Sequence, residues 1–277
     1  MPDIIDTWNE GKVVDIEGYY ENAKINRVYV DRVHVKKAFA EYTAAYNADD
    51  PKIKLKIDHT YRVAALCERI AKAAGMCAYD VELAWLSGML HDVGRFEQIK
   101  RYNTFSDADS VDHAKFGADL LFKDGLISTF LKGMVKCTGY KPGALEDRYD
   151  SDGVFLYDRL NKSDMEMLEL AIRCHNMYRI PQGLNCREQA FCNVLRDADK
   201  VDIFKVNIDT PLEEIYNTTT EELMKSDITD EVLEAFDEEH CILKAIRRTP
   251  ADTVIGHVSL AYEPVSYTHL TLPTNRE

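Results

Sequence analysis

The apolar positions of the chain follow a helical period along most of its length. Over 30–46, apolar residues recur at every third or fourth position, and NADDP at 47–51 ends this pattern. A second helix is predicted over 54–74, with Gly75 as its C-cap. A third helix, over 80–92, is apolar on nearly all sides, so we expect it at the centre of a helical bundle.

The second half of the chain continues the pattern with interruptions. Further helices are predicted over 110–122, 165–176, 187–204 and 229–247. The polar segment 96–106 and the turn-rich segment 137–150 are expected to be irregular connections. Strand signals are sparse, so the sequence predicts an all-α fold.

The predicted domain organisation is simple. Residues 1–29 are weakly patterned and are expected to form a polar lead-in, followed by one main domain over 30–264. The end, VSYTHLTLPTNRE at 265–277, resembles translated sequencing-adapter read-through at the ends of metagenomic reading frames. We therefore expect a non-native tail and a natural chain that continues past about Pro264. The alternative is a genuine disordered tail.

Composition and charge narrow the function classes. The net charge of -14 argues against a general binder of duplex nucleic acid, but it permits a small phosphorylated substrate held by a few local cations. Seven cysteines without a CxxC pair are typical of a reducing cytoplasm. No apolar run reaches the roughly 18–20 residues of a membrane span, and a signal-peptide core is absent near Met1. We therefore expect a cytoplasmic protein.

The candidate chemistry begins where the most apolar helix ends. His91 and Asp92 close the run LAWLSGMLHDVGR at 83–95. Unpaired buried polar groups cost on the order of 1–3 kcal/mol each, and a divalent metal would satisfy both side chains. An isolated pair of this kind is more often a satisfied core histidine beside a capping aspartate.

Four more polar side chains favour a metal site over an ordinary core histidine. They lie on faces that the periodicity turns towards the core: His59, His113, His175 and Asp199. One such histidine is usually an ordinary core residue, but six polar groups in one interior favour a shared metal centre. Six ligands exceed the need of one ion that must also bind water and substrate, so two ions are expected.

The order of these residues resembles a known signature. His59, then His91–Asp92, then Asp199 in RDADK resembles the H…HD…D pattern of the HD-domain superfamily of metal-dependent phosphohydrolases. The resemblance covers about residues 55–205 and implies an all-α core with inward-pointing ligands. It also implies that these four residues hold one ion.

Two further histidines extend the resemblance. His113 in DHAKFG and His175 in CHN fall where family members with a two-metal site carry their extra histidines. The resemblance implies that these residues hold a second ion and that Asp92 bridges the two. The wider sequence is similar to uncharacterised bacterial HD-domain proteins. It lacks the GYP sequence of cyclic-di-GMP phosphodiesterases and the RxxED-type loop of ppGpp hydrolases, so neither activity carries over.

Basic residues close to these ligands suit a phosphate, particularly in an acidic protein. Each lies within four residues of a ligand: Arg95, Lys115, Arg179 and Lys200. For each, the alternative is a solvated surface charge, which for Arg95 would pair with Glu97. Because Gly94 allows a sharp turn, we expect the Arg95 guanidinium to face the open side of the metals and to bind phosphate, with Lys115 or Lys200 assisting.

Asp202 follows Asp199 by three residues and lies on a neighbouring helical face. It could orient a metal ligand, act as a general base, or be a plain helix carboxylate.

The leading hypothesis is a hydrolase that cleaves a phosphate ester or anhydride, in a nucleotide or another small phosphorylated molecule, by metal-activated water. His/Asp ligation suits Mn, Fe, Co and Ni alike. One alternative is a di-iron oxygenase on the same scaffold, as in inositol oxygenase and a phosphonate-cleaving relative. The other is a non-catalytic metal- or nucleotide-binding sensor.

Overall fold

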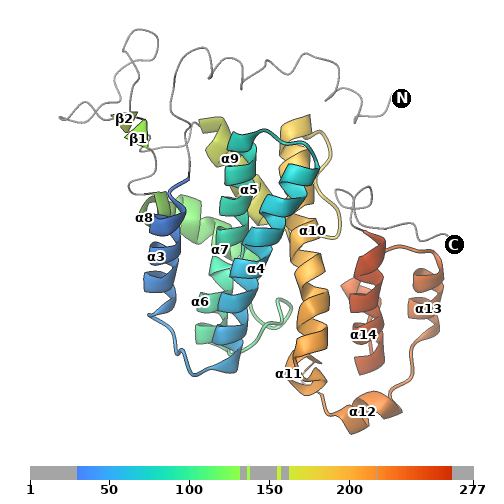
Figure 1. Ribbon diagram of the computed structural model, residues 1–277. Helices are drawn as coiled ribbons and strands as arrows, with labels where there is room; N and C mark the ends of the chain where they lie inside the picture. Colours follow the sequence, from blue (N-terminus) through green and yellow to red (C-terminus); the bar gives the residue numbers. More distant parts are fainter. Residues whose placement is uncertain (1–29, 132–135, 138–154, 157–161, 217, 264–277) are drawn as a thin grey trace, which may run out of the picture.

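The described chain is a helical bundle followed by several shorter helices (Figure 1). The computed structural model describes residues 30–131, 136–137, 155–156, 162–216 and 218–263. The bundle contains α3 (Arg32–Thr43), α4 (Pro51–Ala73), α5 (Ala78–Leu90), α6 (Val93–Tyr102), α7 (His113–Ala118), the π-helix η1 (Asp119–Lys123), α8 (Ile127–Leu131), α9 (Lys162–Cys174) and α10 (Cys186–Asp209). The shorter elements are α11 (Leu212–Tyr216), α12 (Thr220–Lys225), α13 (Asp230–Asp237), η2 (Lys244–Ile246), α14 (Pro250–Val258) and η3 (Ser259–Tyr262).

The all-α prediction is confirmed. Two strands of two residues each, β1 (Lys136–Cys137) and β2 (Phe155–Leu156), form an antiparallel pair in which Lys136 lies opposite Leu156. The predicted lead-in 1–29, the turn-rich segment after Cys137 and the tail 265–277 lie outside the described residues. Among the helices that the structure describes, none is long and apolar enough to cross a membrane.

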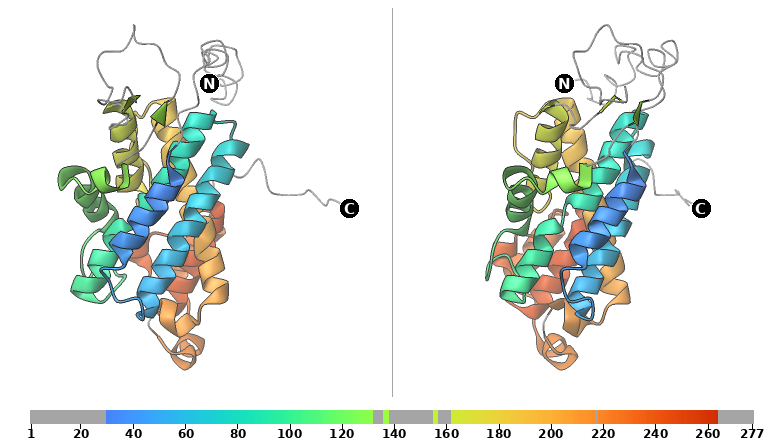
Figure 2. Two further views of the ribbon diagram at one scale, coloured as in Figure 1. Left: turned by 60° about the vertical axis from the view of Figure 1, so that its left-hand side comes forward. Right: turned by 90° about the vertical axis from the view of Figure 1, so that its left-hand side faces the viewer.

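The centre of the bundle is α5, as its apolar sequence predicts. It packs along α4 and also contacts α9 and α10 (Figure 2). The contact with α4 is close because position 88 is glycine: a Cβ there would lie 2.6 Å from the Cα of Ala64. This close packing brings the C-terminal end of α5 beside the middle of α4, where His59 lies.

Capping residues set the boundaries of the two long helices. Asp50 accepts a hydrogen bond from the backbone N–H of Lys52, and Pro51 occupies the first turn, so α4 begins before the predicted residue 54. A capping box between Asn185 and Glu188 begins α10.

The expectation of an irregular connection over 96–106 is wrong, because α6 covers most of it. Phe96 and Ile99 are buried in the core, while charged residues on the outer face obscure this short apolar stripe in the sequence. Gly94 therefore lies inside a helix and makes no sharp turn. A Cβ at Gly94 would lie 2.4 Å from the carbonyl oxygen of His113, so this glycine permits close contact between α6 and α7.

The single helix predicted over 229–247 is also wrong. Helix α13 ends at Asp237, and Glu239 has a φ of 55°, which breaks the helix. The buried residues Cys241 and Ile242 then pack from non-helical backbone, which a helical period cannot indicate. Helix α14 follows and lies beside α10 (Figure 1).

Candidate metal centre

Six polar side chains from separate parts of the chain meet inside the bundle. His59 comes from α4, His91 and Asp92 follow α5, His113 begins α7, His175 follows α9, and Asp199 lies in α10. Five of them are at most 3% exposed, and the Asp199 side chain is 17% exposed. The structure thus brings together all the side chains predicted to bind metal.

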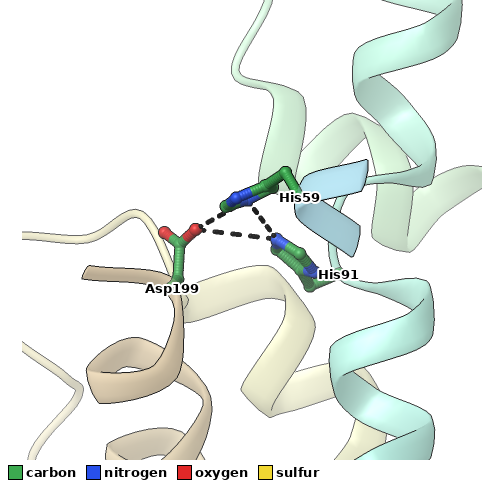
Figure 3. Close-up of side chains that lie close together, drawn as sticks. All are labelled: His59, His91 and Asp199. Atoms are coloured by element: carbon green, nitrogen blue, oxygen red, sulfur yellow. Dashed lines mark hydrogen bonds and ion pairs between the residues drawn. The ribbon is translucent and has the colours of Figure 1, made fainter. Parts of the chain in front are cut away.

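One half of the cluster is formed by His59, His91 and Asp199 (Figure 3). The Nε2 atom of His59 lies 3.0 Å from Oδ1 of Asp199 and 3.2 Å from Nε2 of His91. The Nε2 atom of His91 lies 3.6 Å from the same Asp199 oxygen. Three potential ligand atoms therefore surround one point.

The other half is formed by His113 and His175, whose Nε2 atoms are 3.1 Å apart. Asp92 joins the two halves. Its Oδ2 lies 3.4 Å from Nε2 of both His59 and His91, whereas its Oδ1 lies 3.5 Å from Nε2 of His113 and 3.7 Å from Nε2 of His175. One carboxylate thus presents a different oxygen to each pair of histidines.

The outer nitrogens of two histidines bind backbone carbonyls. The Nδ1 atom of His91 lies 2.8 Å from the carbonyl oxygen of Gly88, and that of His175 lies 2.7 Å from the carbonyl oxygen of Ile172. A carbonyl oxygen can only accept, so each Nδ1 must carry a proton. Each ring is thereby fixed in the tautomer that leaves Nε2 free to bind a metal.

The other two histidines bind carboxylates in the same way. The Nδ1 atom of His59 lies 2.7 Å from Oδ2 of Asp202, and that of His113 lies 2.7 Å from Oδ2 of Asp107. Arg62 holds Asp202 through two hydrogen bonds of 2.6 and 2.9 Å. Asp202 therefore takes the first of its three predicted roles, that of orienting a histidine predicted to bind metal.

In this tautomer the Nε2 lone pairs face one another within each pair of histidines. The Nε2 atoms are 3.2 Å apart between His59 and His91 and 3.1 Å apart between His113 and His175. Facing lone pairs repel unless a cation or proton lies between them. Around His91, burial opposes a charge, but Asp92 and Asp199 outweigh it and raise the pKa to about 10. Burial and the nearby Arg95 lower the pKa of His113 to about 3. Without metal, His91 thus retains a second ring proton that His113 does not.

The Asp92 carboxylate supports the presence of a cation. Burial opposes its charge, yet Lys56 and His91 hold its pKa well below the ordinary value, so it is ionised. Its Oδ1 is buried and has no hydrogen-bond partner among the described residues. An ionised buried oxygen without a partner is costly, and a divalent ion would satisfy it. The donor set and this oxygen both fit a metal centre.

Arg95 lies beside the cluster and is held by three acceptors. Its Nη1 donates to Oε1 of Gln98 at 2.7 Å, to the carbonyl of Phe105 at 2.7 Å and to Oδ1 of Asp107 at 3.0 Å. Its Nε is 3.8 Å from Oδ1 of Asp92. Arg95 therefore supports the Asp107 carboxylate that orients His113, and these contacts differ from the alternative of a pairing with Glu97.

The other predicted cations contact residues outside the six clustered side chains. Lys115 is exposed and pairs with Asp112 at 3.0 Å, because its position on α7 faces solvent. Lys200 contacts Glu263, because one residue along a helix rotates its side chain about 100° from Asp199. Arg179 is exposed and stacks over Tyr178.

The sequence analysis did not identify two residues that contact the cluster, Lys56 and Asp107. The Nζ atom of Lys56 lies 2.7 Å from Oδ2 of Asp92. The position of Lys56 in the sequence could have indicated this contact, since Lys56 precedes His59 by about one helical turn on the same face. Asp107 gave no such signal, because it lies in a non-helical connection whose position depends on tertiary contacts.

Comparison with known proteins identifies the family. The family model described as HD domain matches residues 57–246, which is more than half of the chain. The chain belongs to the HD-domain family. This membership supports a metal-dependent hydrolase.

The crystal structure of a predicted HD superfamily hydrolase from an uncultured Thermotogales bacterium is similar at 22% identity. The match covers 63% of this chain and 74% of the other, with a TM-score of 0.36. No curated protein matched.

Proposed function

We propose that this HD-domain protein is a phosphohydrolase that cleaves a phosphate ester or anhydride of a small molecule, such as a nucleotide. We further propose that its six clustered side chains hold two divalent transition-metal ions. The observation that carries this proposal is the position of Asp92, whose two oxygens face two separate pairs of histidines. Such a carboxylate is suited to bridging two adjacent ions.

Bound divalent ions would supply the means to polarise a phosphoryl group and to activate a water for in-line attack. The chain itself supplies fixed ligands, since hydrogen bonds from all four Nδ1 atoms lock the histidine rings. Rings held in this way do not need to reorganise when metal and substrate bind.

Two cations flank the bridging carboxylate and would neutralise a substrate phosphate. Lys56 lies next to Oδ2 of Asp92, and the Nε of Arg95 lies on the Oδ1 side. Phe105 packs against both, with its ring centre 5.6 Å from Lys56 Nζ and 5.8 Å from Arg95 Cζ. Lys56 provides a mobile point charge, whereas Arg95 offers the planar guanidinium that matches phosphate geometry.

A panel of small phosphate esters and anhydrides, assayed for phosphate release with Mn, Fe, Co and Ni separately, tests the proposal. We expect metal-dependent turnover of at least one class and its loss in Asp92→Ala. Oxygen consumption by iron-loaded protein without phosphate release would support the oxygenase alternative. Metal binding without turnover of any compound would support the sensor.

The proposed partner is a small phosphorylated substrate. We propose that the protein binds neither duplex nucleic acid nor a membrane. The proposed location is the cytoplasm. It is supported by the cysteines, because those whose side chains the structure describes are all free: Cys67, Cys77, Cys174, Cys186, Cys192 and Cys241.

A further inference from the structure

A cavity of about 340 Å³ lies between α10 and the segment that follows α9. Its lining includes Tyr178, Arg196, Lys200 and Glu263. Arg196 and Lys200 are one helical turn apart on α10, three residues before and one residue after Asp199. None of the six clustered side chains lines the cavity, so it is a separate site built partly on the same helix.

Two buried cations share one carboxylate in this cavity. Arg196 and Lys200 are each 8% exposed. Oε2 of Glu263 lies 3.3 Å from Nη2 of Arg196 and also accepts from Nζ of Lys200. Arg196 donates in addition to the carbonyl oxygen of Tyr178 at 3.0 Å. Its Nε is buried and has no hydrogen-bond partner within the described part of the chain, so the cavity contains more donors than these acceptors satisfy.

The charge of the lining is also unusual for this protein. The titratable lining residues are Arg179, Arg196, Lys200, Asp197 and Glu263, so three cations face two carboxylates. The chain as a whole carries a net charge of -14. A local excess of positive charge within an acidic protein favours a small anion.

Arg187, on the same helix, provides a comparison. It binds Asp80 at 2.6 Å and Asp164 at 2.7 Å, and these partners outweigh burial and raise its pKa. Burial lowers the pKa of Arg196, and the acids around it do not compensate. Arg196 contacts the carboxylate of Glu263 at 3.3 Å and keeps a buried Nε without a hydrogen-bond partner among the described residues, so it has donor capacity for a further anion.

We propose that this cavity binds the phosphate group of a small molecule, with Arg196 and Lys200 as donors and Glu263 in the place of the anion. A phosphate suits these donors better than a carboxylate does, because it carries up to two negative charges and three terminal oxygens. The Glu263 side chain is 19% exposed, so it can move aside without opening the core. This proposal does not depend on the reaction at the metal centre.

Calorimetric titration of the full chain with inorganic phosphate at constant ionic strength tests the proposal. Phosphate held by metal ions should be lost after EDTA treatment, whereas binding in the cavity should remain. In EDTA-treated protein, Lys200→Gln should weaken phosphate binding by about tenfold or more through loss of a charge-assisted bond. Glu263→Gln should strengthen it by about threefold or more, because it removes a competing carboxylate.

Lys205→Gln is the matched control. Lys205 lies on α10, is exposed and pairs with Asp209, so its loss should leave phosphate affinity unchanged. Opposite responses of Lys200→Gln and Glu263→Gln would support the proposal. Absence of phosphate binding in both EDTA-treated wild type and Glu263→Gln would overturn it, as would equal binding by Lys200→Gln and wild type. If Lys200→Gln does not fold, the titration of Glu263→Gln still tests the proposal, which requires this variant to bind phosphate more tightly than wild type.

Discussion

The Nζ atom of Lys56 lies 2.7 Å from Oδ2 of Asp92, inside the cluster that we assign to metal. In the proposed reaction this ammonium group would neutralise the phosphate of the substrate. Lys56→Met should therefore keep both ions but lower kcat/KM for phosphate esters about 30- to 1,000-fold, because a charge that stabilises the transition state is lost. Metal analysis and steady-state kinetics measure the two effects.

Lys54→Met is the control for this change, since Lys54 is exposed on the same helix. It should behave as wild type. Near-normal kcat/KM in Lys56→Met would remove Lys56 from the substrate site, and loss of both ions would show that it serves the fold of the cluster.

Asp107 should control the second ion through His113. Asp107→Asn removes the charge that accepts the Nδ1 proton of His113 and weakens the hold of Arg95. The affinity for one of two ions should fall about 10- to 100-fold, the usual effect of losing a partner of a metal-binding histidine. Titration with metal should then show one tight and one weak site. Asp109→Asn, in the same connection and exposed, should retain two tight sites.

Arg95 combines support for Asp107 with a proposed contact to phosphate. Arg95→Lys preserves the positive charge but not the planar fork. We expect metal content to be kept and kcat/KM to fall about 10- to 100-fold, since only part of the charge-assisted bonding survives. If the variant instead loses one ion and regains full activity at high metal concentration, Arg95 serves only to position Asp107.

Gly94 should be intolerant of any side chain. A Cβ at Gly94 would lie 2.4 Å from the carbonyl of His113, whereas one at Gly117 would lie 3.0 Å from the nearest atom. Gly94→Ala should cost about 1–3 kcal/mol of stability or more, and Gly117→Ala should cost less. Urea denaturation of the two variants measures this order. Equal stability of Gly94→Ala and wild type would contradict the close contact between α6 and α7.

Metal binding should release protons. The pKa of His91 is raised to about 10 in the metal-free protein, so its charged form stabilises the fold fully below its ordinary pKa of 6.5. This stabilisation is lost as the pH rises through about 10. A metal ion replaces the proton, so metal affinity should increase with pH up to that value, with at least about one proton released per chain near neutral pH. Calorimetry in buffers of different ionisation enthalpy counts the protons, and zero release would contradict the charged His91.

The sequence was most informative where a long apolar stripe fixes the orientation of a helix. The stripe of α4 places His59 inward, and the nearly apolar α5 ends at His91 with no alternative to burial. Helix α6 was missed because its apolar stripe is short and charged residues surround it. The break after α13 was missed because Cys241 and Ile242 are buried by tertiary contacts and not by helical period.

For the site, residue type and periodicity were enough to select the six clustered side chains. They could not place the cations, because one residue along a helix turns Lys200 away from Asp199 and into another cavity. The partnership of Asp107 with His113 depends on how α6, α7 and their connection pack together, which no local pattern encodes.

The most direct measurement is anomalous X-ray scattering from crystals of the protein loaded with Mn or Co. We predict two peaks roughly 3.5–4 Å apart. One should lie among His59, His91 and Asp199, the other beside His113 and His175, with Asp92 between them. A single peak, or a second peak that does not contact His113 and His175, would contradict the two-ion centre.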